Sequence, residues 1–195
     1  MATRNRHKFR ELTALLRVPG VRWRSLTALP GAPAVRETGR SFEANAVKKA
    51  RAVARATGRL AVADDSGLEV EALRWGPGVR SARFAGSHGD DRANNRKLLR
   101  RLAGLLPRSR RARYRCVLAL ASPARVLAVA RGAWAGRIAD GPRGRGGFGY
   151  DPVFVVPGLG KTVGELAPAV KRRLSHRSRA ARRLLPALRR LARAA

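Results

Sequence analysis

The segment 60–67 constrains the fold more than any other part of the chain. It reads Leu-Ala-Val-Ala-Asp-Asp-Ser-Gly, so a short apolar run ends abruptly at two adjacent carboxylates, a hydroxyl and a glycine. Short apolar runs bounded by turn residues are typical of buried strands, and Asp, Ser and Gly are ordinary turn formers. The sequence therefore predicts a strand over residues 60–63 that leads into an acidic turn at 64–67.

This acidic turn is unusual because the chain is otherwise poor in acid. The 195 residues include 12 Asp and Glu against 43 Lys and Arg, which gives a formal charge of +31. Six of the 12 acids fall between positions 37 and 71: Glu37, Glu43, Asp64, Asp65, Glu69 and Glu71. Carboxylates concentrated in this way indicate a bound cation, and Mg²⁺ is the natural candidate because it takes oxygen ligands. The other interpretation is a plain turn at a strand end, and these residues alone favour neither.

Length and composition restrict the class of protein. A chain of 195 residues with 45% hydrophobic residues suits one domain over residues 1–195, organised as two lobes. No stretch approaches the ~18 apolar residues of a membrane span, and no apolar segment follows the basic N-terminus. The single cysteine, Cys116, cannot form an intrachain disulfide. We therefore expect a cytoplasmic protein with no membrane contact.

The positive charge raises a second possible function. Of the 43 cations, 37 are Arg and six are Lys, and they are spread over the whole length. That distribution resembles coding bias more than a designed patch, but the field would still attract polyanions. A basic nucleic-acid-binding protein is therefore the alternative, with binding that is non-specific if it occurs at all.

Helical and strand patterns alternate along the chain, which predicts an α/β fold with a mixed sheet. We expect four helices, over residues 6–17, 42–57, about 91–106 and from about Ser178 onward. Ser41 should cap the second helix and Gly58 should end it, and Asp90 or Asp91 should cap the third. Pro186 should kink or shorten the last helix. We expect strands near residues 21–26, 60–63, 114–120, 126–134 and 152–156, with a glycine-rich loop at 141–149.

Two clusters in the N-terminal third could carry chemistry. Thr3-Arg4-Asn5-Arg6-His7-Lys8 lies at a helix start, where exposed N–H groups, a hydroxyl and an ammonium can hold phosphate. The alternative is a simple helix cap, although cations in a first turn oppose the helix dipole. The second cluster is Glu37-Thr38-Gly39 together with the acidic turn.

Two further clusters lie in the C-terminal third. Around Phe148 and Tyr150, glycines leave both aromatic rings exposed beside Asp151. The alternative is a glycine-rich turn with core aromatics. Lys171 and Ser175-His176-Arg177 form a group of donors before the last helix, for which the alternative is a solvated helix cap.

Taken together and in order, these clusters resemble the inosine/xanthosine triphosphate pyrophosphatases, over nearly the whole chain. The matching motifs are Ala2-Thr3-Arg4-Asn5 with Lys8, Glu37-Thr38-Gly39 with Phe42-Glu43-Ala44-Asn45-Ala46, Ala63-Asp64-Asp65-Ser66-Gly67-Leu68-Glu69-Val70, Pro77-Gly78-Val79 with Ser81-Ala82-Arg83-Phe84-Ala85-Gly86, Gly147-Phe148-Gly149-Tyr150-Asp151-Pro152, Lys161-Thr162, Glu165-Leu166 and Ser175-His176-Arg177.

The resemblance implies an elongated two-lobed fold, with a central mixed β-sheet flanked by helices and an active-site cleft between the lobes. It implies a homodimer that binds one Mg²⁺ per subunit and hydrolyses dITP, ITP and XTP to the monophosphate and pyrophosphate, which removes deaminated purines from the nucleotide pool. A pyrophosphatase for other modified nucleotides is a further alternative.

The resemblance also implies residue roles. Asp65 would be the catalytic base or a metal ligand, Glu37 the second metal ligand and Asp64 a supporting neighbour. Because side chains alternate along a strand, Asp64 and Asp65 cannot both face one metal while the chain stays extended. The expected substrate contacts are Thr3, Arg4, Asn5, Arg6, His7 and Lys8 around the triphosphate, Ser66 on the nucleotide, Phe148 stacked on the purine, Gly149, Tyr150 and Asp151 shaping the pocket, and Lys171, His176 and Arg177 on the base edge.

Some positions depart from the family pattern. Only Met1 and Ala2 precede the first motif, so we expect either a start codon upstream or a sheet that lacks most of one strand. Arg4 replaces a glycine, His7 replaces a small residue or lysine, and Phe84 replaces a tyrosine. None of these changes removes a group that the reaction requires.

Overall fold

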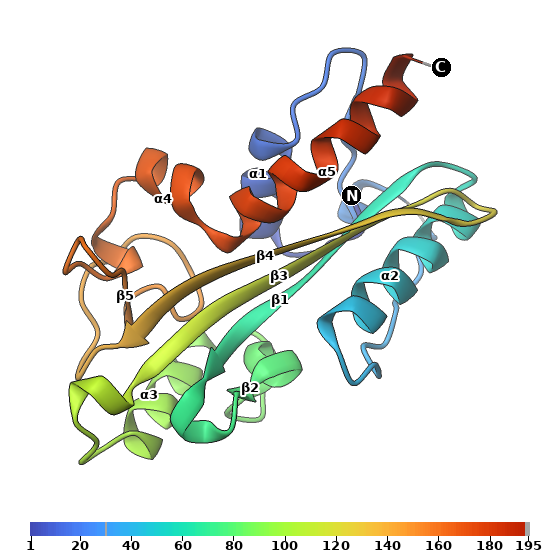
Figure 1. Ribbon diagram of the computed structural model, residues 1–195. Coiled ribbons are helices and arrows are strands. Elements are labelled where there is room, and N and C mark those ends of the chain that lie inside the picture. The colour runs from blue at the N-terminus through green and yellow to red at the C-terminus, as the bar shows by residue number, and fades with distance from the viewer. Residues whose placement is uncertain (30, 194–195) are drawn as a thin grey trace. The chain divides into compact units, whose positions relative to one another are not determined.

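The computed structural model describes residues 1–29 and 31–193. The described residues form an α/β fold (Figure 1), which confirms the predicted class. Its helices are α1 (Arg6–Leu15), α2 (Phe42–Thr57), α3 (Asp91–Arg101), α4 (Pro168–Leu174) and α5 (His176–Arg193). Its strands are β1 (Ala61–Val70), β2 (Gly76–Pro77), β3 (Arg111–Ala121), β4 (Val126–Ile138) and β5 (Phe154–Val155). No helix in these residues is long and apolar enough to cross a membrane.

The strands form one sheet in the order β2-β1-β3-β4-β5. The β1–β2 and β4–β5 pairs are antiparallel, and a short turn at residues 122–125 joins β3 to β4 (Figure 1). A mixed sheet was expected, with most of one strand missing before the first helix unless the start codon lies upstream. Residues 1–5 form no strand, and Ala2 N–H donates one hydrogen bond to the carbonyl of Val62 at 2.7 Å.

The chain divides into two compact units. Unit 1 comprises Met1–Asp65, Cys116–Gly132 and His176–Ala195, and unit 2 comprises Ser66–Arg115 and Ala133–Ser175. Each of the three long strands therefore contributes one end to each unit.

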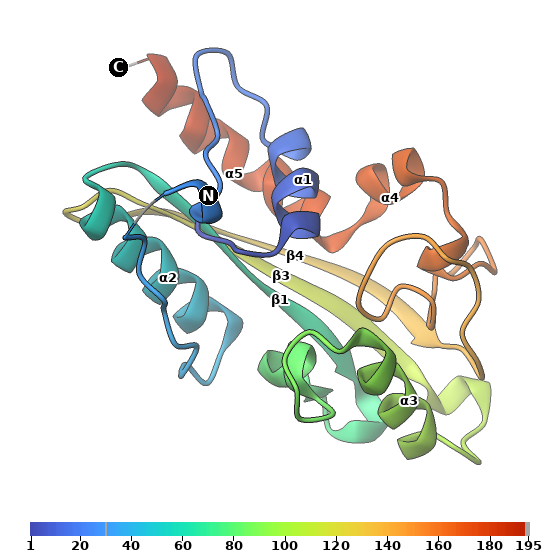
Figure 2. The same ribbon diagram turned by 180° about the vertical axis from the view of Figure 1, so that it is seen from behind.

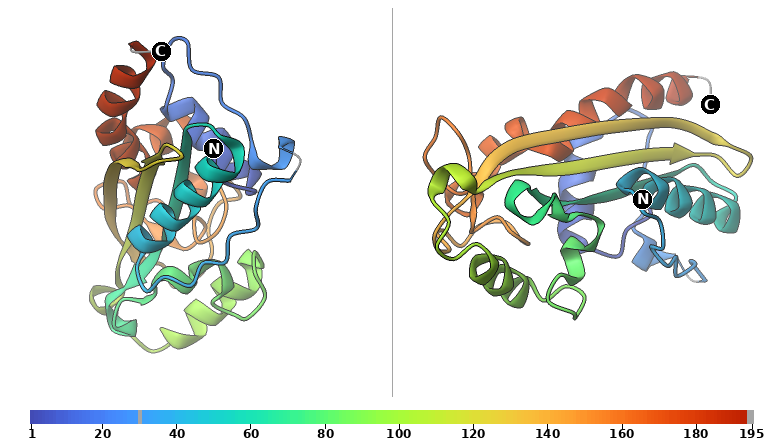
Figure 3. Two further views of the ribbon diagram at one scale, coloured as in Figure 1. Left: turned by 90° about the vertical axis from the view of Figure 1, so that its right-hand side faces the viewer. Right: turned by 60° about the horizontal axis from the view of Figure 1, so that its bottom comes forward.

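In unit 1 the core lies between the strand ends and the helices α1 and α5. These two helices run side by side (Figures 1 and 2), and their buried faces meet residues of β1 and β3. The core includes Leu12, Leu16, Val62, Cys116, Leu118, Ala180, Ala181 and Leu184. Helix α2 lies on the other side of the same strands (Figure 3) and buries a separate apolar face.

Unit 2 has its own core around Phe154. Its ring packs against Tyr114 at a centroid distance of 4.4 Å and against Trp134 at 5.8 Å. Leu98 and Leu102 of α3 belong to the same cluster.

The helix boundaries follow the capping residues. Ser41 accepts a hydrogen bond from Ala44 N–H at 3.1 Å at the start of α2, and Gly58 ends that helix with φ of 64°. Asp90 caps α3 through Ala93 N–H at 2.9 Å. Pro186 was expected to kink or shorten the last helix, and α5 continues past it to Arg193, so the helix is not shortened there. Helix α4 was not predicted.

Three predicted features of the strands differ from the structure. Residues 21–25 form no strand, because the indole of Trp23 donates to the carbonyl of Leu16 at 3.0 Å and Ser25 caps a 3₁₀ turn. The predicted acidic turn is also absent, because β1 continues through Asp64, Asp65, Ser66 and Gly67 to Val70. The expected strand at 152–156 is reduced to the two residues of β5.

Candidate functional site

The two adjacent carboxylates of β1 have different partners, as expected for an extended chain. Asp64 is fully buried, and its Oδ1 lies 2.5 Å from the ammonium of Lys8 on α1. Its Oδ2 accepts the thiol of Cys116 at 3.2 Å and lies 3.7 Å from Nε of Arg177 on α5. Asp64 therefore belongs to the face of the strand that α1 and α5 cover.

Asp65 instead belongs to the face that α2 covers. Its Oδ2 accepts the amide of Asn45 at 3.1 Å, and its Oδ1 lies 3.4 Å from the ammonium of Lys49. Asn45 and Lys49 are four residues apart, so they share one face of the helix. These partners explain why an acid can remain inside a buried strand, where unpaired charge would be costly.

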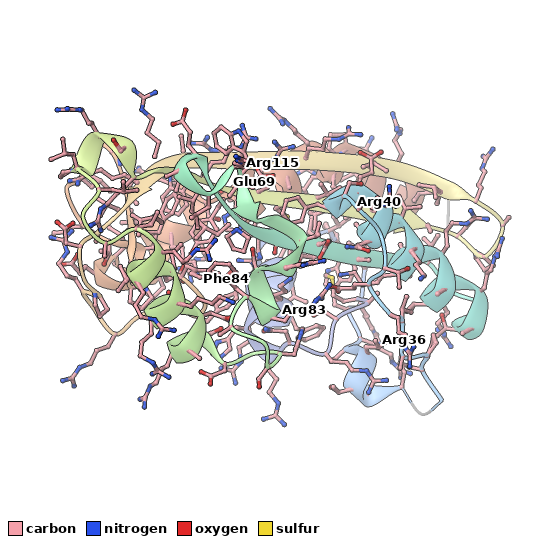
Figure 4. All side chains as sticks on the ribbon, turned by 90° about the horizontal axis from the view of Figure 1, so that it is seen from below. Arg36, Arg40, Glu69, Arg83, Phe84 and Arg115 are labelled. Atoms are coloured by element: carbon pink, nitrogen blue, oxygen red, sulfur yellow. The ribbon has the colours of Figure 1, made fainter. Side chains whose placement is uncertain are left out.

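A second carboxylate approaches the same cation. Oε1 of Glu37 lies 2.6 Å from the ammonium of Lys49, so Glu37 and Asp65 converge on one positive group. The segment that contains Glu37 is held at Gly39, whose N–H donates to Oδ1 of Asn45 at 2.7 Å. A Cβ at position 39 would lie 2.6 Å from that oxygen, so only glycine permits this approach. Exposed Arg36 and Arg40 flank the segment (Figure 4).

This donor set fits a hard divalent cation. Glu37 and Asp65 both contact the ammonium of Lys49, and Mg²⁺ needs only one or two carboxylates when substrate phosphates complete its shell. The described residues contain no group of three or more His, Cys, Asp or Glu side chains that could hold an ion unaided.

The charges in this cluster shift one another. Burial would raise the pKa of Asp64, but Lys8, Arg177 and Lys49 outweigh it and hold that pKa well below its usual range. Burial, helped by Glu37 and Asp64, raises the pKa of Asp65 despite Lys49 and Lys8. For Lys49, burial is outweighed by Asp65, Glu37 and Asp64, so its pKa rises. The neighbouring acids are thus distinct: Asp64 is firmly ionised, and Asp65 takes up a proton more readily.

The start of α1 gathers the predicted phosphate ligands. Oδ1 of Asn5 caps the helix by accepting Lys8 N–H at 3.0 Å, and Asn5 N–H donates to the hydroxyl of Thr3 at 3.2 Å. The guanidinium of Arg4 donates to the carbonyl of Ala32 at 3.1 Å. Arg6 and His7 are exposed. Thr3, Asn5 and Lys8 therefore lie together, while Arg4 is anchored to a loop.

In unit 2, Asp151 organises the predicted base site. Its Oδ2 accepts the N–H of Phe148 at 2.9 Å and the ammonium of Lys171 at 2.7 Å, and its Oδ1 accepts the hydroxyl of Tyr114 at 3.0 Å. The ammonium of Lys171 lies 4.6 Å from the centre of the Phe148 ring. A Cβ at Gly147 would lie 2.0 Å from the Asp151 carboxylate, so glycine is required there.

Gly149 and Tyr150 complete this loop. Gly149 has φ of 64°, and its N–H donates to Asp91 at 2.6 Å. Tyr150 is buried, and its hydroxyl donates to the carbonyl of Ser81 at 2.8 Å. The expectation that the glycines leave the Tyr150 ring exposed is therefore wrong, and the buried ring supports the loop.

Lys171 and Arg177, which the sequence analysis placed in one group of donors, contact residues of different units. Lys171 contacts Asp151 and Phe148 in unit 2, whereas Arg177 lies buried in unit 1 with Nη1 3.1 Å from Oε2 of Glu11. His176 is buried at the start of α5, and Ser66 follows Asp65 in β1.

Sequence analysis missed several partners of the site residues. They are Glu11, Asn45, Lys49, Asp91, Tyr114, Cys116 and Asn95, whose side-chain amide donates to the carbonyl of Gly149 at 2.9 Å. For Asn45 and Lys49 a signal existed, because these two polar residues lie four apart in a helix that follows Glu37 closely. The others had no such signal, since they are distant in the sequence from the residues they contact.

Comparisons with known proteins agree with this arrangement. A model of the Ham1 family matches residues 1–187. The dITP/XTP pyrophosphatase of Geobacillus kaustophilus is 50% identical over 94% of this chain and 90% of that protein. The dITP/XTP pyrophosphatase of Mycolicibacterium paratuberculosis is 50% identical over 100% of this chain and 97% of that protein.

Solved structures show the same fold. The Ham1 protein of Staphylococcus aureus has a TM-score of 0.85 and 40% identity, over 96% of this chain and 95% of that chain. A HAM1 protein from Coxiella burnetii has a TM-score of 0.86 and 39% identity, over 95% of each chain. The resemblance seen in the sequence is confirmed, and the chain belongs to the Ham1 family.

Proposed function

We propose that this chain is a metal-dependent nucleoside triphosphate pyrophosphohydrolase that converts dITP, ITP and XTP to the monophosphate and pyrophosphate. The observation that carries the proposal is the convergence of Glu37 and Asp65 on the ammonium of Lys49, which brings two carboxylates to one cation. It is supported by relatives named dITP/XTP pyrophosphatases that match nearly the full length of the chain. Family likeness also favours a homodimer, which analytical ultracentrifugation would test.

The start of α1 is proposed to hold the triphosphate. Helix N-termini favour anions because their first N–H groups are unpaired and the dipole is positive there. Thr3 and Asn5 add polar groups, and Lys8 adds a charge-assisted donor. Asp64 orients the ammonium of Lys8, and Arg177, held by Glu11, helps to keep Asp64 ionised.

Glu37 and Asp65 would hold one Mg²⁺. When bound, the ion would neutralise phosphate charge and polarise the reacting groups. Asp65 is proposed to accept a proton from the attacking water. Lys49 would stabilise negative charge on the phosphate oxygens as water attacks the α-phosphorus and pyrophosphate leaves.

The loop of residues 147–151, called the Phe148 loop below, is proposed to bind the base. The ring of Phe148 offers a stacking face, and the ammonium of Lys171 beside it is a donor. Hypoxanthine and xanthine carry a 6-oxo acceptor, whereas adenine carries a 6-amino donor. A donor facing adenine would lose its partner, and sites of this kind can reject the wrong base by ~10⁴ or more.

Pyrophosphate release from ITP, XTP, GTP and ATP with Mg²⁺ tests the proposal. We expect kcat/KM to be highest for ITP and XTP and lowest for ATP. The value for GTP should lie well below that for ITP because of the 2-amino group of guanine. Asp65→Asn should lower kcat by ~10²–10⁴ while the protein still folds. Equal kcat/KM for ATP and ITP would contradict the base assignment, and more than about a tenth of normal activity in Asp65→Asn would contradict the role of Asp65.

A further inference from the structure

Two side chains of helix α3 form hydrogen bonds with the main chain of Gly149 in the Phe148 loop. Gly149 N–H donates to Oδ2 of Asp91 at 2.6 Å, and the carbonyl of Gly149 accepts Nδ2 of Asn95 at 2.9 Å. Asp91 and Asn95 are four residues apart, so they project from the same face of α3. Both polar groups of Gly149 are therefore bound to one helix.

The contact between Gly149 and α3 depends on the backbone conformation of Gly149. Its φ of 64° is a conformation that residues with a Cβ rarely adopt. Both of its main-chain groups can meet one helix only while this conformation is kept. The orientation of the Asn95 amide is fixed as well, because its Oδ1 would repel the carbonyl of Gly149 if the amide were reversed.

Gly149 directly follows Phe148, so the contact acts on the aromatic ring. On the N-terminal side of the same residue, Phe148 N–H donates to Asp151 at 2.9 Å. The peptide plane after Phe148 is thus held by α3, and the one before it by Asp151. Together these bonds restrict how the ring of Phe148 can turn.

Other contacts hold the loop without α3. Tyr150 is anchored to Ser81, and Asp151 is anchored to Tyr114 and Lys171. The loop would therefore remain folded if the two contacts of α3 to Gly149 were lost. What those two contacts add is the direction of the main chain at Phe148.

We propose that Asp91 and Asn95 are positioning residues for base binding, which fix the stacking ring of Phe148 through Gly149. The inference rests on the proposed function of Phe148 as the base platform. Asp91 and Asn95 act through the loop and touch no reacting atom. Their loss should therefore weaken nucleotide binding and leave the chemical step unchanged.

The test is the steady-state kinetics of ITP hydrolysis by Asp91→Ala and Asn95→Ala. One lost hydrogen bond to the loop should raise KM for ITP roughly tenfold, while kcat changes by less than about twofold. Asp91→Asn keeps an acceptor for Gly149 N–H, so it should restore most of the normal KM. This variant also keeps the inference testable if Asp91→Ala folds poorly.

Asp90→Ala is the matched control. Asp90 caps α3 through Ala93 and makes none of the contacts to Gly149. Its loss should lower the melting temperature and leave KM unchanged. If Asp90→Ala raises KM as much as Asp91→Ala does, or if Asp91→Ala lowers kcat and leaves KM unchanged, the inference is wrong. Failure of the unaltered protein to hydrolyse ITP would instead overturn the proposed function.

Discussion

At the scale of single residues, Asp64 and Asp65 are neighbours with opposite effects on stability. The pKa of Asp64 lies below its usual value, so its charge stabilises the folded state above about pH 4, the usual range for Asp. The pKa of Asp65 is raised, so its charge costs the folded state free energy at neutral pH. One substitution at each position should separate the two effects.

Asp64→Asn should destabilise the protein at pH 7 by about 3 kcal/mol or more, because it removes the buried charge that pairs with half-buried Lys8 and with buried Arg177. Asp65→Asn should raise the urea midpoint in the presence of EDTA, because it removes a charge that burial disfavours. Urea unfolding from pH 7 to pH 3 would measure both. The difference between Asp64→Asn and the unaltered protein should shrink below about pH 4, where the unfolded carboxylate becomes protonated.

A loss of stability in Asp65→Asn equal to that in Asp64→Asn would contradict this assignment. Asn is nearly isosteric with Asp at both positions, so each substitution is the control for the other. In Asp65→Asn, Lys49 keeps Glu37 as a partner, which prevents a new unpaired charge.

Strand alternation needs only local information, so the sequence predicted that these two acids would not both face one metal if the chain stayed extended, although it also predicted a turn there. It did not predict their partners. Lys8 and Arg177 are 169 residues apart, yet both approach Asp64. Such contacts depend on how helices pack, and a local pattern carries no signal for them.

At the scale of elements, β4 and α5 meet at one glycine. A Cβ on Gly132 would lie 2.1 Å from the carbonyl of His176 and 2.6 Å from the N–H nitrogen of Ala180. Both are backbone atoms of α5, so neither can move away as a flexible side chain would. The absence of a side chain at this position lets the strand pass close to the first turns of the helix.

Gly132→Ala should therefore destabilise unit 1 by about 1–3 kcal/mol or more, since overpacking shifts the backbone. Gly141→Ala is the matched control, because a Cβ there would meet no atom within 4 Å. Thermal unfolding of the two variants would compare them. Equal melting temperatures would show that β4 does not approach α5 as closely as the structure indicates.

Element boundaries were predictable where a single residue determines them. Ser41, Gly58 and Asp90 mark helix ends because they bond or bend the backbone locally. The end of β1 was not predictable in this way. Asp64-Asp65-Ser66-Gly67 has the composition of a turn, but Asn45 and Lys49 satisfy Asp65, and Cys116 and Lys8 satisfy Asp64, so the strand continues.

At the scale of the whole molecule, positive charge greatly exceeds its possible partners. The 12 acids can neutralise at most 12 of the 43 cations if each pairs once. Some acids already have partners, as Glu69 does with Arg113 at 2.5 Å and with Arg115 at 3.9 Å (Figure 4). Most arginines therefore face solvent, including Arg179, Arg182, Arg183, Arg189, Arg190 and Arg193 on α5.

This excess charge should make duplex DNA bind weakly and without sequence preference. Binding that depends on phosphate contacts falls steeply with salt, by roughly 10³-fold or more between about 50 and 200 mM when several phosphates are contacted. Fluorescence anisotropy with two duplexes of unrelated sequence, over a salt series, would measure it. Arg189→Gln with Arg190→Gln should reduce the salt slope by up to about one unit per charge removed, and ITP hydrolysis should not change because neither residue belongs to the proposed site. Tight binding to only one of the duplexes at physiological salt would instead favour the nucleic-acid-binding function over the enzyme.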